Sequence, residues 1–272
     1  MKIRQVITGQ TGLSRTDRVA ALCYACSLTP ERLYADLDSD IADADLEVLE
    51  KCLNERMSGK PLAYITGRRE FFSETFTVNE NVLIPRPETE VLVEGALERL
   101  RGAKGRTILD MGCGSGAIGT IVAKETGNRV FCVDISHEAL KCARQNARSL
   151  GVDGLTEFAC SDLFEALGTG IQFDMILANL PYVTSGELAQ LMPDVRDFEP
   201  RLALDGGEDG LDVYRRLIAS LPGRLVPGGD ILLEIGSAHQ ARELKALLEG
   251  AGLGIQIIND YANKERVVAG HG

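Results

Sequence analysis

The chain carries two short segments whose side chains could do chemistry, and the first is Asn179-Leu180-Pro181-Tyr182. It places an amide, a proline-fixed bend and an aromatic ring next to one another, a combination that suits the binding of a small planar polar group. The apolar run Phe173–Ala178 before it predicts a buried strand, which Pro181 prevents from continuing. Asn179 is therefore expected at the carboxyl end of a strand, the edge at which open α/β sheets bind their ligands.

The second segment, the glycine turn at residues 110–116, has the pattern D-x-G-x-G-x-G and joins a predicted strand to a predicted helix. Glycines at alternate positions let a ligand approach the backbone closely, and the start of the helix offers free N–H groups. The pattern differs from the G-x-G-x-x-G of dinucleotide-binding proteins. Asp110 would repel a pyrophosphate, yet directly or through water it could hold a cationic amino-acid group. The turn therefore favours S-adenosylmethionine, which has such a group, over a dinucleotide.

Two further acidic residues follow the next predicted strands. Asp134 ends the second strand, where a carboxylate can accept hydrogen bonds from both ribose hydroxyls of a nucleoside. Asp162 follows the third strand, where it could accept from an adenine amino group or instead cap a helix. The cofactor-binding residues predicted from these positions and their neighbours are Asp110, Gly112, Cys113, Gly114, Ser115, Gly116, Asp134, Asp162, Leu163 and Asn179.

The elements that must position these residues alternate regularly from Thr107 onward. Apolar runs separate segments with helical periodicity, a pattern typical of an α/β fold with a doubly wound, mainly parallel sheet. Strands are predicted at 107–110, 129–134, 156–160, 173–178, 230–235, 254–258 and 266–269, and helices at 116–124, 137–150, 211–221 and 239–248.

The part of the chain before this region predicts a different architecture. Apolar residues recur at three- and four-residue steps over residues 16–57, which indicates small packed helices, and the pattern ends around Pro61. Alternating residues over 71–84, with Asn79-Glu80-Asn81 between them, predict a short hairpin. We therefore expect a helical domain at 1–70, a hairpin linker at 71–86 and a sheet domain at 87–272.

Charge and cysteine content narrow the class of protein. The formal net charge of −11 argues against a protein that gains affinity by neutralising nucleic-acid phosphates. Seven scattered cysteines fit reduced, buried side chains better than a disulfide framework, and the Cys23 and Cys26 pair fits a packed helix face better than a metal site. No apolar run reaches the roughly 18 residues of a membrane helix, so no membrane contact is expected and the cytoplasm is the expected location.

Two loops flank the candidate site in the sequence. Arg86 and Glu88 precede the sheet and could cover a cofactor, and Glu88 is equally suited to capping a helix. Glu199 and Arg201 are expected to pair with each other and to hold the loop beyond the site. The segment 206–210 predicts a flexible turn before a helix.

Taken together, the glycine turn, Asp134, Asp162 and the Asn-Leu-Pro-Tyr segment resemble a class I S-adenosylmethionine-dependent methyltransferase. The Asn-x-Pro-Tyr element is similar to that of enzymes that methylate adenine N6, cytosine N4 or a protein glutamine amide. Three further stretches of the sequence resemble the HemK/PrmC family, whose members methylate a glutamine of peptide chain release factors. These are Tyr-Ile-Thr-Gly at 64–67, Ile-Pro-Arg-Pro-Glu-Thr-Glu at 84–90 and Phe-Glu-Pro-Arg-Leu-Ala-Leu at 198–204. The match runs from the helical part to the last strand, and it departs at Leu180, where the family more usually has a second proline.

The resemblance implies that the chain transfers methyl from S-adenosylmethionine to the side-chain amide nitrogen, N5, of the glutamine in the Gly-Gly-Gln motif of release factors. It implies catalytic roles for Asn179, Pro181 and Tyr182, and substrate contacts for these three and Leu180. An amide nitrogen is a poor nucleophile, so positioning must do much of the work. The Asn179 side-chain oxygen and the Leu180 carbonyl could accept the two amide protons while Tyr182 packs against the amide plane. The N-terminal helices would orient the release factor.

Two other functions fit parts of the pattern. The same segment could serve a base amino group, so N6-adenine methylation of DNA or RNA is the alternative activity, although the chain shows no evident domain for base recognition. A translation-factor binding module without turnover is a non-enzymatic alternative, and the intact Asn179 and Tyr182 speak against it.

Overall fold

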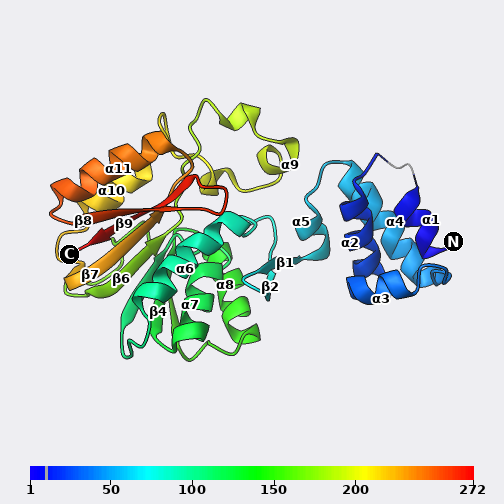
Figure 1. Cartoon of the computed structure of the whole chain (residues 1–272), viewed down its shortest axis with the longest axis horizontal. Coiled ribbons are helices and arrows are strands. Elements are labelled where there is room, and N and C mark those ends of the chain that lie inside the picture. The colour runs from blue at the N-terminus through cyan, green and yellow to red at the C-terminus, as the bar shows by residue number, and fades with distance from the viewer. Residues whose placement is uncertain (10–11) are drawn as a thin grey trace. The chain divides into compact units, whose positions relative to one another are not determined.

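The structure, a computed structural model, describes residues 1–9 and 12–272, and the chain divides into two compact units (Figure 1). One unit comprises Met1–Arg68 and Met192–Phe198, and the other comprises Arg69–Leu191 and Glu199–Gly272. The second unit contains both segments singled out for their chemistry, the glycine turn and the Asn-Leu-Pro-Tyr loop (residues 179–182).

The first unit is a group of short helices around its own apolar core, in which Leu22, Leu33 and Leu49 are completely buried. Side chains mark two of the helix starts, because Ser14 and Thr29 each accept a hydrogen bond from a backbone amide of the first turn. The helices are α1 (Ile3–Thr8), α2 (Arg15–Ala25), α3 (Pro30–Ala35), α4 (Asp43–Met57), α5 (Leu62–Thr66) and α9 (Pro193–Arg196).

Three of these helices, α1, α5 and the four-residue α9, are not predicted by the periodicity. α1 has only six residues, too few to show a repeating apolar face. α5 begins directly after Pro61, where the sequence indicated the end of the helical region. Proline at the start of a helix costs no hydrogen bond, so Pro61 introduces a new helix instead of ending the helical part. Cys23 and Cys26 are unpaired and pack against the core of this unit, as the packed-face interpretation predicts.

The second unit begins with a hairpin whose turn differs from the prediction. β1 (Arg68–Phe71) and β2 (Glu74–Thr77) form a two-stranded sheet, joined by Phe72 and Ser73, which have φ of 51° and 60°. Positive φ at both positions is the conformation of a two-residue type I′ turn. The predicted hairpin over 71–84 is therefore wrong in its bounds. A turn does form at 79–82, where the Val82 amide donates to the Asn79 carbonyl at 3.2 Å, but the hairpin is complete before it. Phe72 and Ser73 carry no turn signature, and the Glu90 carboxylate, which accepts from the Phe72 amide at 2.9 Å, helps to hold the turn.

A sheet of seven strands, in the order β5-β4-β3-β6-β7-β9-β8, forms the centre of this unit. The strands from β5 to β7 run parallel to their neighbours, and β9 is antiparallel to both β7 and β8. The predicted doubly wound, mainly parallel sheet is confirmed. Chain order reverses between β3 and β6, so the carboxyl ends of these strands are the switch point of the sheet. The strands are β3 (Thr107–Met111), β4 (Arg129–Asp134), β5 (Thr156–Cys160), β6 (Phe173–Ala178), β7 (Leu225–Glu234), β8 (Gly254–Asn259) and β9 (Glu265–His271).

Helices cover both faces of the sheet (Figure 1). Alternate strand residues pack into the two layers: Leu177 contacts the helices of one face, and Ile176 and Ala178 contact those of the other. This two-sided burial explains why the strands are continuous apolar runs in the sequence. Packed on one face are α6 (Glu90–Arg99), α7 (Ala117–Thr126) and α8 (His137–Ser149), and on the other α10 (Asp212–Ala219) and α11 (Ala238–Gly250).

Within the described residues, short 3-10 helices lie in the connections at η1 (Pro87–Thr89), η2 (Leu188–Gln190) and η3 (Arg201–Ala203). η1 runs directly into α6, and Pro87 stands at the start of η1, where a proline costs no backbone hydrogen bond. Among the helices of residues 1–9 and 12–272, none is long and apolar enough to cross a membrane.

Candidate functional site

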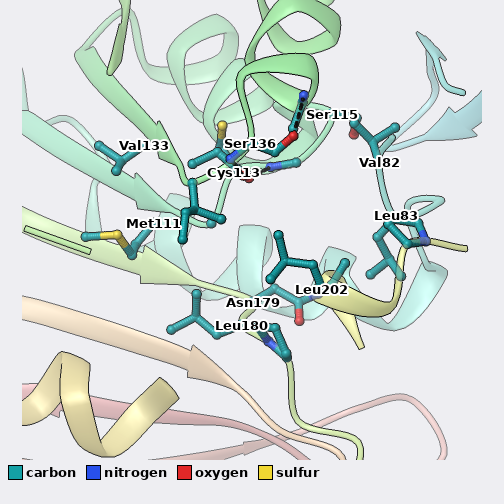
Figure 2. Close-up of a pocket in the computed structure, with 18 of the residues that line it drawn as sticks. Val82, Leu83, Met111, Cys113, Ser115, Val133, Ser136, Asn179, Leu180 and Leu202 are labelled. Atoms are coloured by element: carbon teal, nitrogen blue, oxygen red, sulfur yellow. Dashed lines mark hydrogen bonds between the residues drawn. The ribbon is translucent and has the colours of Figure 1, made fainter. Parts of the chain in front are cut away.

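The predicted site segments meet at the carboxyl ends of β3, β4, β5 and β6. A cavity of about 310 Å³ lies there, and segments distant in sequence, 80–86 and 200–203, complete its wall. Figure 2 shows Cys113 and Ser136 on one side of this cavity and Asn179 on the opposite side. The predicted cofactor residues that line it are Gly112, Cys113, Gly114, Ser115, Asp134, Asp162, Leu163 and Asn179, whereas Asp110 and Gly116 are not part of its wall.

The glycine turn takes its shape from hydrogen bonds to the end of β4. The amides of Gly112 and Cys113 both donate to the Val133 carbonyl, at 2.8 and 3.0 Å. Gly112 has a φ of +72°, and a Cβ at this position would lie 2.7 Å from Leu180 Cδ2. Glycine is therefore needed at position 112 for its backbone conformation and for the close approach of the Asn-Leu-Pro-Tyr loop.

Asp110 lies within β3 and is completely buried. Its Oδ2 accepts a hydrogen bond from the Gly119 amide at 2.8 Å, and its Oδ1 has no hydrogen-bond partner within the described residues. Burial raises the pKa of Asp110 to about 7; the Gly119 hydrogen bond opposes this rise and the nearby charge of Asp134 adds to it. Asp110 thus ties β3 to the first turn of α7. Because its carboxyl is not part of the cavity wall, the geometry favours an indirect interaction of Asp110 with a ligand over a direct hydrogen bond.

The other two acidic residues line the cavity and already have partners in the protein. Asp134 accepts from the Gly114 and Ser136 amides, both at 2.8 Å. Burial raises the pKa of Asp134, and these backbone hydrogen bonds oppose the rise. Asp162 forms an ion pair of 2.7 Å with Arg216 of α10. Arg216, which also lines the cavity, carries no sequence signal that links it to Asp162.

The residue after Asp162 has an unusual backbone conformation. Leu163 has a φ of +50°, in the left-handed region that leucine rarely adopts. It is buried in the wall of the cavity, so a strained backbone position lies directly at the candidate site. Such positions persist where the surrounding structure holds them, and they cluster at functional sites.

Asn179 directly follows β6 and lines the cavity. Its Nδ2 donates to Thr89 Oγ1 at 3.2 Å, whereas no described residue donates a hydrogen bond to its Oδ1. A side-chain amide whose N–H is engaged and whose oxygen is open presents a hydrogen-bond acceptor. Asn179 is thus arranged to accept a hydrogen bond from a bound group.

The backbone of Leu180 is held by Tyr214, a completely buried residue of α10. The Leu180 amide donates to the Tyr214 hydroxyl at 3.1 Å, and this hydroxyl donates to the Glu234 carbonyl at 2.5 Å. A hydroxyl has a single proton, so the Leu180 carbonyl, 3.4 Å from the same oxygen, stays available to another donor. Proline could not donate at position 180, so leucine adds a backbone hydrogen bond where the HemK/PrmC family more usually has proline.

Tyr182 is held at both ends. Gln240 Nε2 donates to its carbonyl at 2.7 Å, and its hydroxyl donates to Glu234 Oε1 at 3.3 Å. Burial, with the charge of Glu234, raises the pKa of Tyr182 above its usual value, so the phenol stays protonated. A Cβ at Gly236 would lie 2.8 Å from the Tyr182 ring, which is not part of the cavity wall. The structure therefore anchors Tyr182 beside the cavity and brings Asn179, Leu180 and Pro181 to it.

The segment 206–210, predicted as a flexible turn, packs against the Asn-Leu-Pro-Tyr loop. A Cβ at Gly206 would lie 2.6 Å from the Pro181 carbonyl oxygen, and one at Gly210 would lie 2.2 Å from the Tyr182 carbonyl oxygen. Backbones can approach so closely only at glycine. These glycines therefore shape the loop, a role that turn signals alone do not reveal.

Glu234 is the main residue of this region that the sequence analysis missed. It ends β7, is completely buried, and its Oε2 has no hydrogen-bond partner within the described residues. Burial raises the pKa of Glu234 to about 7, while Thr89, Arg266 and Tyr182 act to lower it. A single glutamate at the end of an apolar strand is the signal that could have identified it, since buried carboxyls are uncommon and cluster at functional sites.

The loop pairings differ from the prediction. Glu199 is almost completely buried, forms an ion pair with Arg86, and accepts a hydrogen bond from the Ile84 amide at 3.2 Å. Arg201 pairs instead with Asp205, at 3.1 Å. The predicted Glu199–Arg201 pair is wrong, because the helical turn η3 brings Arg201 to the residue four positions later. Arg86, which lines the cavity, is therefore bound to the loop beyond the site.

Two protein families match separate parts of the chain. Residues 9–67 match the PrmC N-terminal domain, and residues 88–193 match the methyltransferase small domain. A release factor glutamine methyltransferase from Moorella thermoacetica is 42% identical over 267 residues, which cover 97% of this chain and 93% of the relative. One from Neisseria gonorrhoeae is 39% identical over 264 residues, which cover 95% of each chain.

A solved structure agrees with the fold. The crystal structure of a methyltransferase from Pyrococcus furiosus aligns with a TM-score of 0.56 over 82% of this chain and 98% of that one. Its sequence identity of 16% means that it supports the fold alone.

Proposed function

This chain belongs to the family of release factor glutamine methyltransferases, and on that premise we propose that it methylates a glutamine side chain of peptide chain release factors. The methyl donor is S-adenosylmethionine, and the acceptor is the N5 amide nitrogen of the glutamine in the Gly-Gly-Gln motif. One observation carries the proposal: the open oxygens of Asn179 and Leu180 belong to a loop that lines the same cavity as the glycine turn.

The residues of the cavity suit S-adenosylmethionine. The carboxylates of Asp134 and Asp162 would accept hydrogen bonds from the ribose hydroxyls and the adenine amino group. A Cβ at Gly114 would meet no atom within 4 Å, so the glycine turn has open space beside it for the amino-acid part. The acidic residues around the turn favour a cationic ligand. When bound, the cofactor supplies a methyl group on a positively charged sulfur.

The Asn-Leu-Pro-Tyr loop would hold the glutamine side chain. Asn179 Oδ1 and the Leu180 carbonyl accept its two amide protons, which fixes the direction of the nitrogen and favours the positive charge that develops on it. Pro181 keeps the bend that presents both oxygens. Tyr182 lies beside the cavity, where Gln240 and Glu234 hold it, and from there it would anchor the loop that presents the two oxygens.

The helical domain expected at 1–70 orients the release factor. Its match to the PrmC N-terminal domain supports this assignment, and Met1–Arg68 form part of a compact unit with its own core. The reaction takes place in the cytoplasm, an assignment that the seven unpaired cysteines support.

Labelled S-adenosylmethionine, incubated with the protein and a release factor, tests the function directly. Label is expected on the release factor and absent when the glutamine of its Gly-Gly-Gln motif is replaced by alanine. Label that persists after this replacement would contradict the substrate assignment. A parallel reaction with DNA and RNA examines the alternative, since label on adenine would favour N6-adenine methylation.

A further inference from the structure

The orientation of the Asn179 amide decides which side chain the site can bind. The Oδ1 atom accepts hydrogen bonds and the Nδ2 atom donates them, so the two orientations of the amide suit opposite guests. An open Oδ1 accepts from a side-chain amide such as glutamine, whereas an open Nδ2 would donate to a carboxylate such as glutamate. The groups around Asn179 must therefore hold one orientation if the site is to be selective.

Thr89 is the residue that contacts the Asn179 amide. It ends η1, is 4% exposed, and its Oγ1 accepts the hydrogen bond from Nδ2 at 3.2 Å. A threonine hydroxyl can accept hydrogen bonds and has one proton to donate. While that proton is donated elsewhere, the oxygen remains an acceptor and Nδ2 remains its partner. The acceptor of the Thr89 proton therefore determines the orientation of Asn179.

Glu234 provides that acceptor. The Thr89 hydroxyl lies beside its carboxyl group, close enough to act on its ionisation. Oε1 already accepts from Tyr182 at 3.3 Å, and Oε2 is fully buried without a partner among the described residues. A buried oxygen without a donor is costly, and the proton of the Thr89 hydroxyl would satisfy Oε2. An ionised carboxylate can only accept, so it sets the direction of the whole chain of hydrogen bonds.

We propose that Glu234 and Thr89 form a hydrogen-bond relay that orients the Asn179 amide, and that this orientation makes the enzyme select glutamine over glutamate. The carboxylate takes the Thr89 proton, the Thr89 oxygen accepts from Nδ2, and Oδ1 is left for the substrate. Both are positioning residues, because they act through Asn179 and not on the reacting atoms. The inference rests on the proposed function, since it concerns the same loop and the same substrate side chain.

The relay requires Glu234 to be ionised, and its surroundings set the pH range in which this holds. Burial raises the pKa of Glu234 to about 7; Arg266 on β9 lowers it and Glu88 on η1 raises it further. Tyr182 and Tyr214 also face this carboxyl, and burial keeps both phenols protonated. As the pH falls through about 7, the carboxyl gains a proton and can donate instead of accept. Selectivity for glutamine is therefore expected to weaken toward acidic pH.

The test compares two release factors, one with the natural Gly-Gly-Gln motif and one in which its glutamine is replaced by glutamate. The full-length enzyme methylates the first, and the second serves as a competitive inhibitor. The readout is the ratio of the inhibition constant of the glutamate form to the KM of the glutamine form. It is measured from about pH 6 to about pH 8.5, a range that includes the pKa of Glu234. Thr89→Val removes the hydroxyl with little change of shape, Thr89→Ser keeps it, and Glu234→Gln removes the charge.

In the wild-type enzyme the glutamate form should inhibit poorly at pH 8. Thr89→Val should lower kcat/KM on the order of tenfold, because the Asn179 amide can then turn. The ratio of the inhibition constant to KM should fall by a similar factor. Thr89→Ser should restore the ratio. Glu234→Gln should also narrow the ratio of the inhibition constant to KM and remove its dependence on pH.

Two results would overturn the relay. Loss of turnover in Thr89→Val and Glu234→Gln with an unchanged ratio would show a merely structural role for both residues. A Thr89→Ser enzyme with the same narrowed ratio as Thr89→Val would show that the hydroxyl is not what matters. If the wild-type enzyme fails to methylate the glutamine form, the proposed function itself is wrong, which separates that failure from failure of the relay.

Discussion

The two ends of the cavity are built in different ways. At the cofactor end, neighbouring loops hold each other through the backbone, as in the hydrogen bonds from the Gly112 and Cys113 amides to the Val133 carbonyl. At the other end, side chains from remote elements support the Asn-Leu-Pro-Tyr loop: Thr89 lies 90 residues from its partner Asn179, and Glu234 lies 52 residues from Tyr182. One end depends on backbone shape and the other on side-chain polarity. Substitutions at the two ends should therefore be detected by different measurements.

The largest effect is expected for Asn179→Ala. Removing the amide takes away an acceptor aimed at the substrate, so kcat for release-factor methylation should fall about 100-fold or more. The dissociation constant of S-adenosylmethionine, measured by calorimetry, should change by less than about threefold, because the cofactor end is held by its own contacts. A parallel collapse of cofactor affinity would show that the two ends are not separable.

Removal of the Arg86 guanidinium tests how much the ion pair with Glu199 contributes to stability. Arg86→Gln leaves the nearly buried Glu199 carboxylate without its ion-pair partner and should lower the free energy of unfolding by about 2 kcal/mol. Arg201→Gln is the matched control, since Arg201 is exposed and pairs with Asp205, and it should cost under about 0.5 kcal/mol. Urea unfolding of both variants measures the difference. Equal losses of unfolding free energy in the two variants would support the prediction that Arg201 helps to hold this loop.

Alanine substitutions at two glycines of the turn distinguish the cost of backbone strain from the cost of steric crowding. Gly112 and Gly114 both have positive φ, so alanine at either position should cost about 1 kcal/mol of stability. At position 112 the new Cβ would also meet Leu180 Cδ2 at 2.7 Å, whereas at 114 nothing lies within 4 Å. Gly112→Ala should therefore lose about 1 kcal/mol more than Gly114→Ala in thermal unfolding without cofactor. Identical losses would mean that the turn and the Asn-Leu-Pro-Tyr loop do not constrain each other.

Each end also contains one buried carboxyl group, and these predict the pH dependence of stability. Burial raises the pKa of Asp110 and of Glu234 to about 7 in the folded protein. The folded state therefore binds these protons more tightly than the unfolded state, whose carboxyls titrate near about 4. The resulting stability is present at low pH and is lost as the pH rises from about 4 to about 7.

Asp110→Asn and Glu234→Gln should each remove the contribution of one group to that loss. At most this changes the slope by about 1.4 kcal/mol per pH unit between the two pKa values. Urea unfolding at several pH values between the two pKa ranges measures it. A slope that is the same in the wild type and both variants would mean that neither carboxyl titrates in this range.

Most of the larger unit could be predicted from the sequence, because burial on both sides of a sheet leaves continuous apolar runs. The runs at 129–134, 156–160 and 173–178 coincide with β4, β5 and β6. The hairpin turn at Phe72 and Ser73 could not be predicted, since neither residue type favours positive φ and Glu90 supports the turn from outside it.

The candidate site likewise contains residues that the sequence could predict and residues that it could not. The glycine turn and Asp134 could be found because residue types with special backbone or charge properties follow consecutive strands. Thr89, Tyr214 and Glu234 are ordinary residues in their own segments, and only the sheet order and the helix packing bring them to the Asn-Leu-Pro-Tyr loop. Contacts of this kind depend on the position of β7 beside β6, which local sequence patterns do not specify.

Mass spectrometry of the release-factor glutamine tests both the methyl transfer and its acceptor residue. A release factor should gain the mass of one methyl group on the glutamine of its Gly-Gly-Gln motif when incubated with this protein and S-adenosylmethionine. The same release factor should remain unmodified when the protein is left out or replaced by the Asn179→Ala variant. An unmodified glutamine after incubation with the active wild-type protein, or a methyl group at another residue, would contradict the account.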